Sequence, residues 1–130
     1  MTNAANRILL VDDEPSLLKM MSVYLGRLGY AVVTAGATEN AWATVEAAPH
    51  AFDLAVLDGT MSGIPMQDLA ARMLAAHPRM CVIAASGYPV DVAILQAAAP
   101  GRVMFLQKPF TPEMLGSAVR RMIATQEEGV

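Results

Sequence analysis

The chain has 130 residues, a length that accommodates one domain. Hydrophobic residues make up 55% of the sequence and charged residues 16%, which is enough apolar material for one large core and excludes disorder over the whole length. Nine basic and twelve acidic residues give a net charge of −3, so the chain would repel a polyanion, and direct binding of nucleic acid is not expected.

Cysteine content and hydropathy restrict the compartment. The single cysteine, Cys81, can form neither an internal disulfide nor a cysteine-rich zinc site, which fits a reducing environment. No apolar run reaches the roughly 18 residues of a membrane span, and the N-terminus lacks the basic-then-apolar order of a signal peptide. We therefore expect a soluble cytoplasmic protein that does not associate with a membrane.

Short apolar runs alternate with segments of helical periodicity along the chain. The expected strands are Ile8–Val11, Val32–Thr34, Leu54–Leu57, Met80–Ala85 and Val103–Leu106. Apolar residues spaced three and four apart predict five intervening helices. The first helix is expected after Pro15 and before Gly29, the second around Ala41 and before Pro49, and the third from Pro65. The fourth is expected over Val90–Ala99, and the fifth from the N-cap Thr111. Residues 1–6 are expected to be a disordered segment, 7–125 the folded domain and 126–130 a frayed tail.

Five strands alternating with five helices predict an α/β fold with a parallel sheet. The strands are continuously apolar rather than alternating, which indicates a sheet buried on both faces with helices on each side. Five units are too few for a closed eight-unit barrel. We therefore expect an open, doubly wound sheet, for which 2-1-3-4-5 is a common order of five strands.

Polar side chains gather at the carboxyl ends of these strands. In an open parallel sheet the ligand site lies beyond those ends, where the strand order reverses, here between the first and third strands. The residues just past the strand ends are Asp12 and Asp13 after the first, Asp58 after the third, Ser86 after the fourth and Lys108 after the fifth. We expect these side chains to share one edge of the sheet.

The three aspartates belong to strands that are neighbours in the expected order. At about 5 Å and an effective dielectric near 20, each pair of carboxylates repels by roughly 3 kcal/mol. Such a cluster either raises a pKa or holds a cation. A site with a few oxygen ligands and no nitrogen or sulfur ligands suits Mg²⁺, which keeps several of its coordinated waters. Lys108 would add a positive charge on the opposite flank.

Each of these residues also has a purely structural explanation. Asp13 stands directly before Glu14 and would suit the N-cap of the first helix. Asp58 and Ser86 would suit turns, and Lys108 would suit a solvated surface position. A site is favoured because the polar groups occur together, at four of the five expected strand ends.

Four motifs make the chain similar to a known family. They are Leu10-Val11-Asp12-Asp13-Glu14, Asp58 with Met61 three residues later, Ser86-Gly87, and Lys108-Pro109-Phe110. On these motifs the chain resembles the receiver domain of two-component response regulators, from about Arg7 to Ile123. The resemblance implies that residues 7–125 form a receiver domain with a flavodoxin-like (βα)5 fold.

The resemblance also implies roles for the acidic residues. Asp58 would be the phosphoacceptor, charged by a histidine kinase or a histidine phosphotransfer protein. Asp13, Asp58 and the backbone carbonyl of Thr60 would bind Mg²⁺, and Asp12 would act mainly through a coordinated water. The domain would assist its own phosphorylation and dephosphorylation without being an enzyme acting on other molecules.

The remaining implied roles concern signalling. Lys108 would pair with the phosphate, Ser86 would be the switch hydroxyl, and Phe105 the switch aromatic. The face made by the fourth helix, fifth strand and fifth helix would carry the signal to an unknown downstream protein, and it is also a candidate dimer interface. The domain would act alone or within a longer protein, and the similarity of Phe105–Glu113 to receivers attached to hybrid sensor kinases favours the longer protein.

The loop after Asp58 departs from the family pattern. Ser62 stands where a proline usually follows the methionine, and Pro65-Met66 stand where an acidic residue and then glycine are common. One alternative is therefore a receiver-like interaction module whose binding does not depend on phosphorylation. A phosphatase of the haloacid dehalogenase type is disfavoured, because Val56 occupies the position of its nucleophile.

Overall fold

The strands and helices alternate as predicted. The computed structural model describes residues 6–48 and 51–128. In chain order the elements are β1 (Arg7–Val11), α1 (Pro15–Arg27), β2 (Ala31–Ala35), α2 (Thr38–Ala47), β3 (Leu54–Asp58), α3 (Met66–Ala76), β4 (Cys81–Ser86), α4 (Ala93–Ala98), β5 (Val103–Gln107) and α5 (Pro112–Glu128). The five strands pair in parallel in the order β2-β1-β3-β4-β5, which confirms the flavodoxin-like arrangement.

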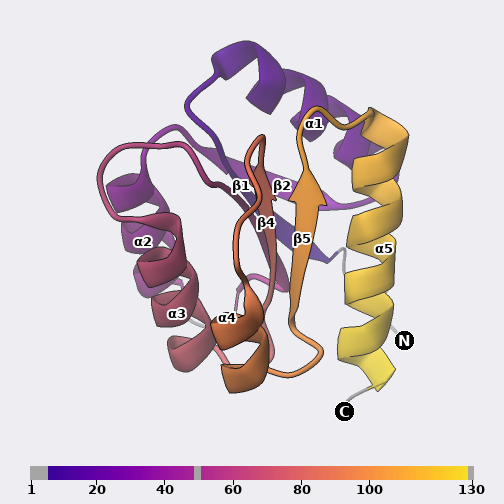
Figure 1. Ribbon diagram of the computed structural model, residues 1–130. Coiled ribbons are helices and arrows are strands. Elements are labelled where there is room, and N and C mark those ends of the chain that lie inside the picture. The colour runs from indigo at the N-terminus through magenta and orange to yellow at the C-terminus, as the bar shows by residue number, and fades with distance from the viewer. Residues whose placement is uncertain (1–5, 49–50, 129–130) are drawn as a thin grey trace.

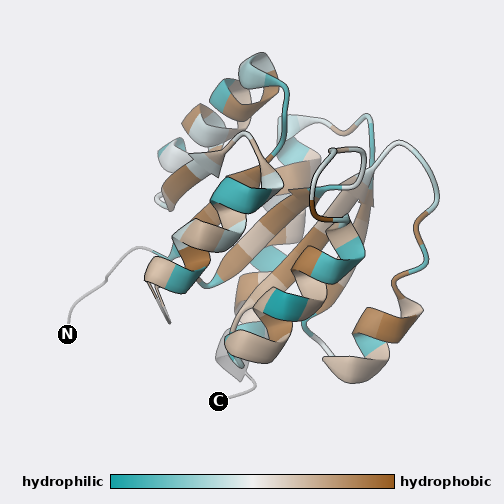
Figure 2. Cartoon of the chain, turned by 90° about the vertical axis from the view of Figure 1, so that its left-hand side faces the viewer, coloured by the Kyte–Doolittle hydropathy of each residue, from teal (hydrophilic) through white to brown (hydrophobic). Residues whose placement is uncertain are grey.

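Helices cover both faces of the sheet, with α2, α3 and α4 on one face and α1 and α5 on the other (Figure 1). Successive strand residues point to opposite faces. Leu9 and Val11 therefore join the core beneath α2, α3 and α4, whereas Ile8 and Leu10 join the core beneath α1 and α5. Figure 2 shows hydrophobic strands in the interior and helices on which polar and apolar residues alternate. No helix among the residues described is long and apolar enough to cross a membrane.

Proline and glycine mark several boundaries of these elements. Pro15 is the first residue of α1, one residue earlier than the expected start, and Gly29 has a left-handed φ of 100° just past its end, as the sequence predicts. Pro65 precedes α3 as its N-cap instead of being its first helical residue. Pro49, which was expected to close the second helix, lies outside the described residues, and α2 ends at Ala47.

The fourth helix is shorter than predicted. The sequence pattern indicated Val90–Ala99, but α4 spans only Ala93–Ala98. Asp91 Oδ1 accepts the backbone N–H of Ala93 at 2.9 Å, so a side-chain turn takes the place of the first helical turn.

Residues near both expected ends of the domain contact distant parts of the chain. Asn6 accepts the N–H of Ala31 at 2.9 Å, and its side-chain amide donates to Asp53 at 3.3 Å. At the other end α5 continues to Glu128, and the Gln126 side chain donates to the carbonyl of Asp53 at 3.2 Å. The other residues of the expected disordered segment, 1–5, and the last two of the tail, 129–130, lie outside the described residues.

Candidate functional site

Three carboxylates converge at the carboxyl ends of two neighbouring strands. Asp12 and Asp13 directly follow β1, and Asp58 is the last residue of β3. Oxygen atoms of the three side chains lie within 4.8 Å of one another. Asp12 and Asp58 are buried, whereas Asp13 is exposed. The structure therefore brings together the three acidic residues that the sequence singled out.

Lys108 reaches this cluster from the end of β5. Its Nζ lies 2.8 Å from Asp12 Oδ2 and 3.2 Å from Asp58 Oδ1. Its backbone N–H donates to the carbonyl of Ser86 at 2.8 Å, which holds the segment after β5 against β4. Burial lowers the pKa of Lys108, but the hydrogen bonds and charges of Asp12 and Asp58 outweigh burial and raise the pKa overall. The side chain is therefore a cation at neutral pH.

The acidic cluster fits a divalent cation. One ammonium group pairs with two of the three carboxylates, which leaves negative charge to be compensated. The carboxylates supply hard oxygen ligands, and the exposure of Asp13 gives water access to complete a coordination shell. This donor set suits Mg²⁺, with Asp12, Asp13 and Asp58 as the groups that would hold it directly or through water.

The loop after β3 restrains the Asp58 carboxylate. Thr60 donates its backbone N–H to Asp58 Oδ1 at 3.2 Å and its hydroxyl to the same oxygen at 3.0 Å, and the hydroxyl is also 3.3 Å from Oδ2. The resemblance singled out Thr60 for its carbonyl alone. The hydroxyl contact depends on the conformation of the loop, and no sequence pattern indicated it.

Ser86 lies beside Gly59, at the end of β4. Its side chain is buried, and its hydroxyl oxygen accepts the N–H of Tyr88 at 3.1 Å. A Cβ on Gly59 would lie only 3.0 Å from Ser86 Cβ, so the close approach of the two segments favours glycine. Phe105 on the neighbouring strand β5 is half-buried against the core beneath α2, α3 and α4. The predicted hydroxyl and ring thus lie on adjacent strands.

The structural explanations for Asp13 and Lys108 do not hold. The residue at the N-cap of α1 is Glu14, and no side chain caps this helix. The carboxylate that accepts the N–H of Glu14, at 3.0 Å, belongs to Asp12. Lys108 is paired with two carboxylates instead of being fully solvated.

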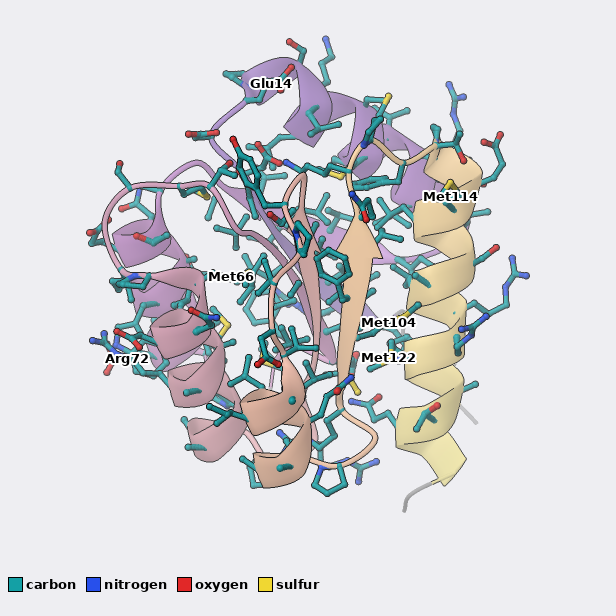
Figure 3. All side chains as sticks on the ribbon, in the orientation of Figure 1. Glu14, Met66, Arg72, Met104, Met114 and Met122 are labelled. Atoms are coloured by element: carbon teal, nitrogen blue, oxygen red, sulfur yellow. The ribbon has the colours of Figure 1, made fainter. Side chains whose placement is uncertain are left out.

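A cleft of about 620 Å³ opens beside Lys108. It is lined by Glu14, Leu17, Thr60, Gly87, Tyr88, Lys108, Pro109 and Phe110. In Figure 3 Glu14 lies at the end of the molecule toward which β5 points, which is the end that carries the acidic cluster. The cleft exposes Lys108 and Thr60 to solvent beside the apolar groups of Leu17, Pro109 and Phe110.

The fold and the site correspond to a known class of signalling domain. The family model of the response regulator receiver domain matches residues 8–120. The chain therefore belongs to this family, the receiver domains of two-component signalling systems.

Two curated relatives show the context in which such a domain occurs. The alginate biosynthesis transcriptional regulatory protein AlgB of Pseudomonas aeruginosa is 31% identical over 121 residues, covering 93% of this chain and 26% of that protein. The DNA-binding transcriptional regulator NtrC of Azospirillum brasilense is 30% identical, covering 92% of this chain and 24% of that protein. The chain thus spans about a quarter of the length of these relatives.

Solved structures show the same fold. A CheY-like response regulator receiver domain protein from Methanospirillum hungatei JF-1 has a TM-score of 0.86 at 24% identity and covers 98% of this chain and 100% of its own. The chemotaxis protein CheY4 of Vibrio cholerae has a TM-score of 0.76 at 27% identity, with coverages of 92% and 99%.

Proposed function

We propose that this receiver domain accepts a phosphoryl group on Asp58 from a phosphohistidine, with Mg²⁺ bound at the acidic cluster. The observation that carries the proposal is that Lys108 Nζ and the carboxylates of Asp12 and Asp13 converge on Asp58. Phosphoryl transfer to a carboxylate depends on positioning and on neutralising the charge of the transferring oxygens. Thr60 would supply the positioning and Lys108 part of the neutralising charge.

The transfer would be a substitution at phosphorus. A carboxylate oxygen of Asp58 forms the new bond to phosphorus, while the bond to the donor imidazole nitrogen breaks and that nitrogen keeps the electron pair. Thr60 orients the Asp58 carboxylate, and Lys108 pairs with the phosphoryl oxygens as their charge builds up. Bound Mg²⁺ supplies the further positive charge that these oxygens require. Asp12, Asp13, Asp58 and the carbonyl of Thr60 are the groups that would hold it.

The phosphorylated state would be read by Ser86 and Phe105. An aspartyl phosphate adds negative charge and strong acceptor oxygens at the end of β3. The Ser86 hydroxyl, which now accepts the N–H of Tyr88, would turn to donate to a phosphoryl oxygen. The space that it leaves would be filled by the half-buried Phe105 ring, and since phenylalanine has no hydroxyl this movement is purely apolar.

The partners follow from this scheme. The donor would be a histidine kinase or a histidine phosphotransfer protein, and the signal would reach a downstream protein through α4, β5 and α5, where Ile94 is 80% and Met114 47% exposed. The same face would also form a dimer interface. The net charge of −3 disfavours direct nucleic-acid binding by this domain, although the relatives are transcriptional regulators. The single buried thiol, Cys81, supports a reducing cytoplasmic location.

The proposal is tested by mass spectrometry of the intact protein after incubation with acetyl phosphate and Mg²⁺. We expect a gain of one phosphoryl group in the wild type and in Asp68→Asn, a control at an exposed position of α3, and no gain in Asp58→Asn. If the wild type gains no phosphoryl group, or if the gain persists in Asp58→Asn, the proposal is wrong. A module that binds independently of phosphorylation would then be favoured.

The switch is tested separately with beryllium fluoride as the phosphoryl mimic. The contacts of the Phe105 ring and the amide resonances of α4, β5 and α5 are compared with and without the mimic by NMR. We expect the ring to become more buried and the resonances of this face to shift. An unchanged ring and an unchanged face would rule out the switch while leaving phosphoacceptance at Asp58 intact.

A further inference from the structure

The loop between β3 and α3 is held by the first residue of α2. Thr38 is buried, with 2% of its surface exposed, and its hydroxyl oxygen accepts the N–H of Ile64 at 2.9 Å. The same hydroxyl lies 3.3 Å from the carbonyl of Ser62 and 3.1 Å from Glu39 Oε1, so its single proton serves one of these acceptors at a time. In Figure 1 the loop passes the N-terminal end of α2. Thr38 thus joins two segments that are far apart in the sequence.

Gly63 makes this close approach possible. Its φ of 94° lies in the left-handed region that glycine adopts without steric cost. A Cβ at this position would collide with Thr38 Oγ1 and lie 2.6 Å from Glu39 Oε2. Any side chain on Gly63 would therefore strain the backbone and push the loop away from the Thr38 hydroxyl.

The held segment is directly connected to the phosphoacceptor. Ser62 follows Thr60 by two residues, and Thr60 donates to the Asp58 carboxylate through both its backbone and its hydroxyl. Between Asp58 and Pro65 the chain contains two glycines and no proline, so its own sequence does little to stiffen it. The contact with Thr38 provides the restraint that the loop itself lacks.

We propose that Thr38 is a positioning residue for the Asp58 site. Its hydroxyl holds residues 62–64 and thereby keeps Thr60 and Asp58 in the arrangement that receives the cation and the phosphoryl group. The inference rests on the proposed function of Asp58 and adds a residue outside the strand-end cluster. A loop that must first be ordered binds its ligand more weakly, because the ordering entropy is lost at the moment of binding.

The loop contact itself is tested without any metal. Thr38→Val removes the hydroxyl at nearly constant volume, and Thr38→Ser keeps it. In metal-free protein we expect hydrogen exchange of the Ile64 amide, followed by NMR, to be about tenfold faster in Thr38→Val and within about threefold of the wild type in Thr38→Ser, since the hydroxyl is the acceptor of that amide.

The consequence for the site is tested by calorimetric titration with Mg²⁺ and by the rate of phosphorylation with acetyl phosphate at limiting Mg²⁺. Loss of one hydrogen bond corresponds to about a fivefold change in an equilibrium constant. We therefore expect the Mg²⁺ dissociation constant to rise about fivefold in Thr38→Val and in Gly63→Ala, with a matching fall in rate, and to remain near the wild-type value in Thr38→Ser.

Val45→Ala is the matched control, because it weakens the buried side of the same helix about two turns away from Thr38. It should lower the melting temperature and leave the Mg²⁺ dissociation constant unchanged. The proposal for Thr38 is overturned if Val45→Ala shifts that constant as much as Thr38→Val, if Thr38→Ser fails to restore it, or if Gly63→Ala leaves it unchanged. If Thr38→Val does not fold, Gly63→Ala decides. A wild type that neither binds Mg²⁺ nor accepts a phosphoryl group contradicts the function of Asp58 instead.

Discussion

Asp12 and Asp58 are charged side chains at the rim of an apolar core, and each is compensated by its own set of donors. Asp12 accepts the N–H of Glu14 and pairs with Lys108, while Asp58 accepts two hydrogen bonds from Thr60 and also faces Lys108. Such compensation is required because an unpaired charge taken out of water costs several kcal/mol. Asp13 makes no ion pair within residues 6–48 and 51–128, so its repulsion with its neighbours is the uncompensated part of the cluster.

We expect Asp13→Asn to stabilise the metal-free protein by on the order of 1 kcal/mol, because it removes two repulsive pairs while the exposure of Asp13 screens them. Urea unfolding in the presence of EDTA measures this effect. With excess Mg²⁺ the wild type should become more stable than Asp13→Asn, since the wild type binds the cation more tightly and is stabilised more by it. Equal stabilisation of both proteins by Mg²⁺ would show that Asp13 is not a ligand.

Lys108 should make stability depend on pH in the alkaline range. Because its pKa is raised above the ordinary value of 10.5, the cation is favoured in the folded state. Its contribution is therefore complete below pH 10.5 and is lost as the pH rises through the folded-state pKa. We expect the stability difference between the wild type and Lys108→Met, measured by urea unfolding, to be constant from neutral pH up to pH 10.5 and to shrink at higher pH. The exposed Lys19→Met is the control, and a difference that grows with pH would contradict the prediction.

At the scale of single elements, α1 shows how local chemistry sets the end of a helix. The N–H of Gly29 donates to the carbonyl of Gly26 at 3.0 Å, and the N–H of Tyr30 donates to that of Leu25 at 3.2 Å. This is the Schellman arrangement, in which a left-handed residue just past the helix turns the chain back on its last carbonyls. Gly29 takes that conformation, which releases the chain into β2.

The two glycines of this segment should respond to alanine in opposite directions. Neither would meet another atom within 4 Å through a new Cβ, so only the backbone conformation matters. Gly26→Ala should stabilise the protein by about 0.5–1 kcal/mol, because alanine is the better helix former. Gly29→Ala should destabilise it by about 1–2 kcal/mol, because φ there is positive. Urea unfolding distinguishes the two, and a shift of the same sign in both would refute the argument.

At the scale of the whole molecule, the sheet is enclosed between two helical layers. Figure 3 shows Met104 and Met122 in the layer between β5 and α5. Cys81 on β4 is fully buried on this side of the sheet, and its Sγ lies 3.7 Å from the carbonyl of Met122. Burial raises the pKa of this thiol, and the nearby charge of Arg102 offsets only part of the effect. Exposing the thiolate therefore requires an opening of the structure around Cys81, either of α5 or of the cavity that Cys81 lines with Arg79 and Arg102.

We expect Cys81 to react with a thiol reagent such as dithionitrobenzoate at least about a thousandfold more slowly in the native protein than in the urea-unfolded chain. As urea is added below the transition, the labelling rate should rise in step with the unfolding equilibrium followed by circular dichroism. Rapid labelling that is insensitive to urea would show that the structure around Cys81 opens locally without global unfolding.

Local patterns were sufficient to predict most of the architecture. Runs of apolar residues identify strands, and polar residues at strand ends identify the edge that carries the site, because parallel strands all point the same way. The parallel sheet was therefore accessible from the residues, and so was the convergence of Asp12, Asp13, Asp58 and Lys108 once the common strand order 2-1-3-4-5 was assumed. The family resemblance added the proposed roles of Ser86 and Phe105.

Other features depend on contacts between segments that are distant along the chain, and no local pattern encodes such contacts. The hold of Thr38 on the loop after Asp58, the hydroxyl of Thr60 on the carboxylate, and the continuation of α5 past Gln126 became visible only in the folded arrangement. The sequence pattern places the start of α4 at Val90, three residues too early, because the Asp91 side chain competes with the helix for the backbone N–H of Ala93. Periodicity thus defined the sheet and the edge that bears Asp58, whereas the packing of one segment on another defined how tightly the Asp58 carboxylate is held.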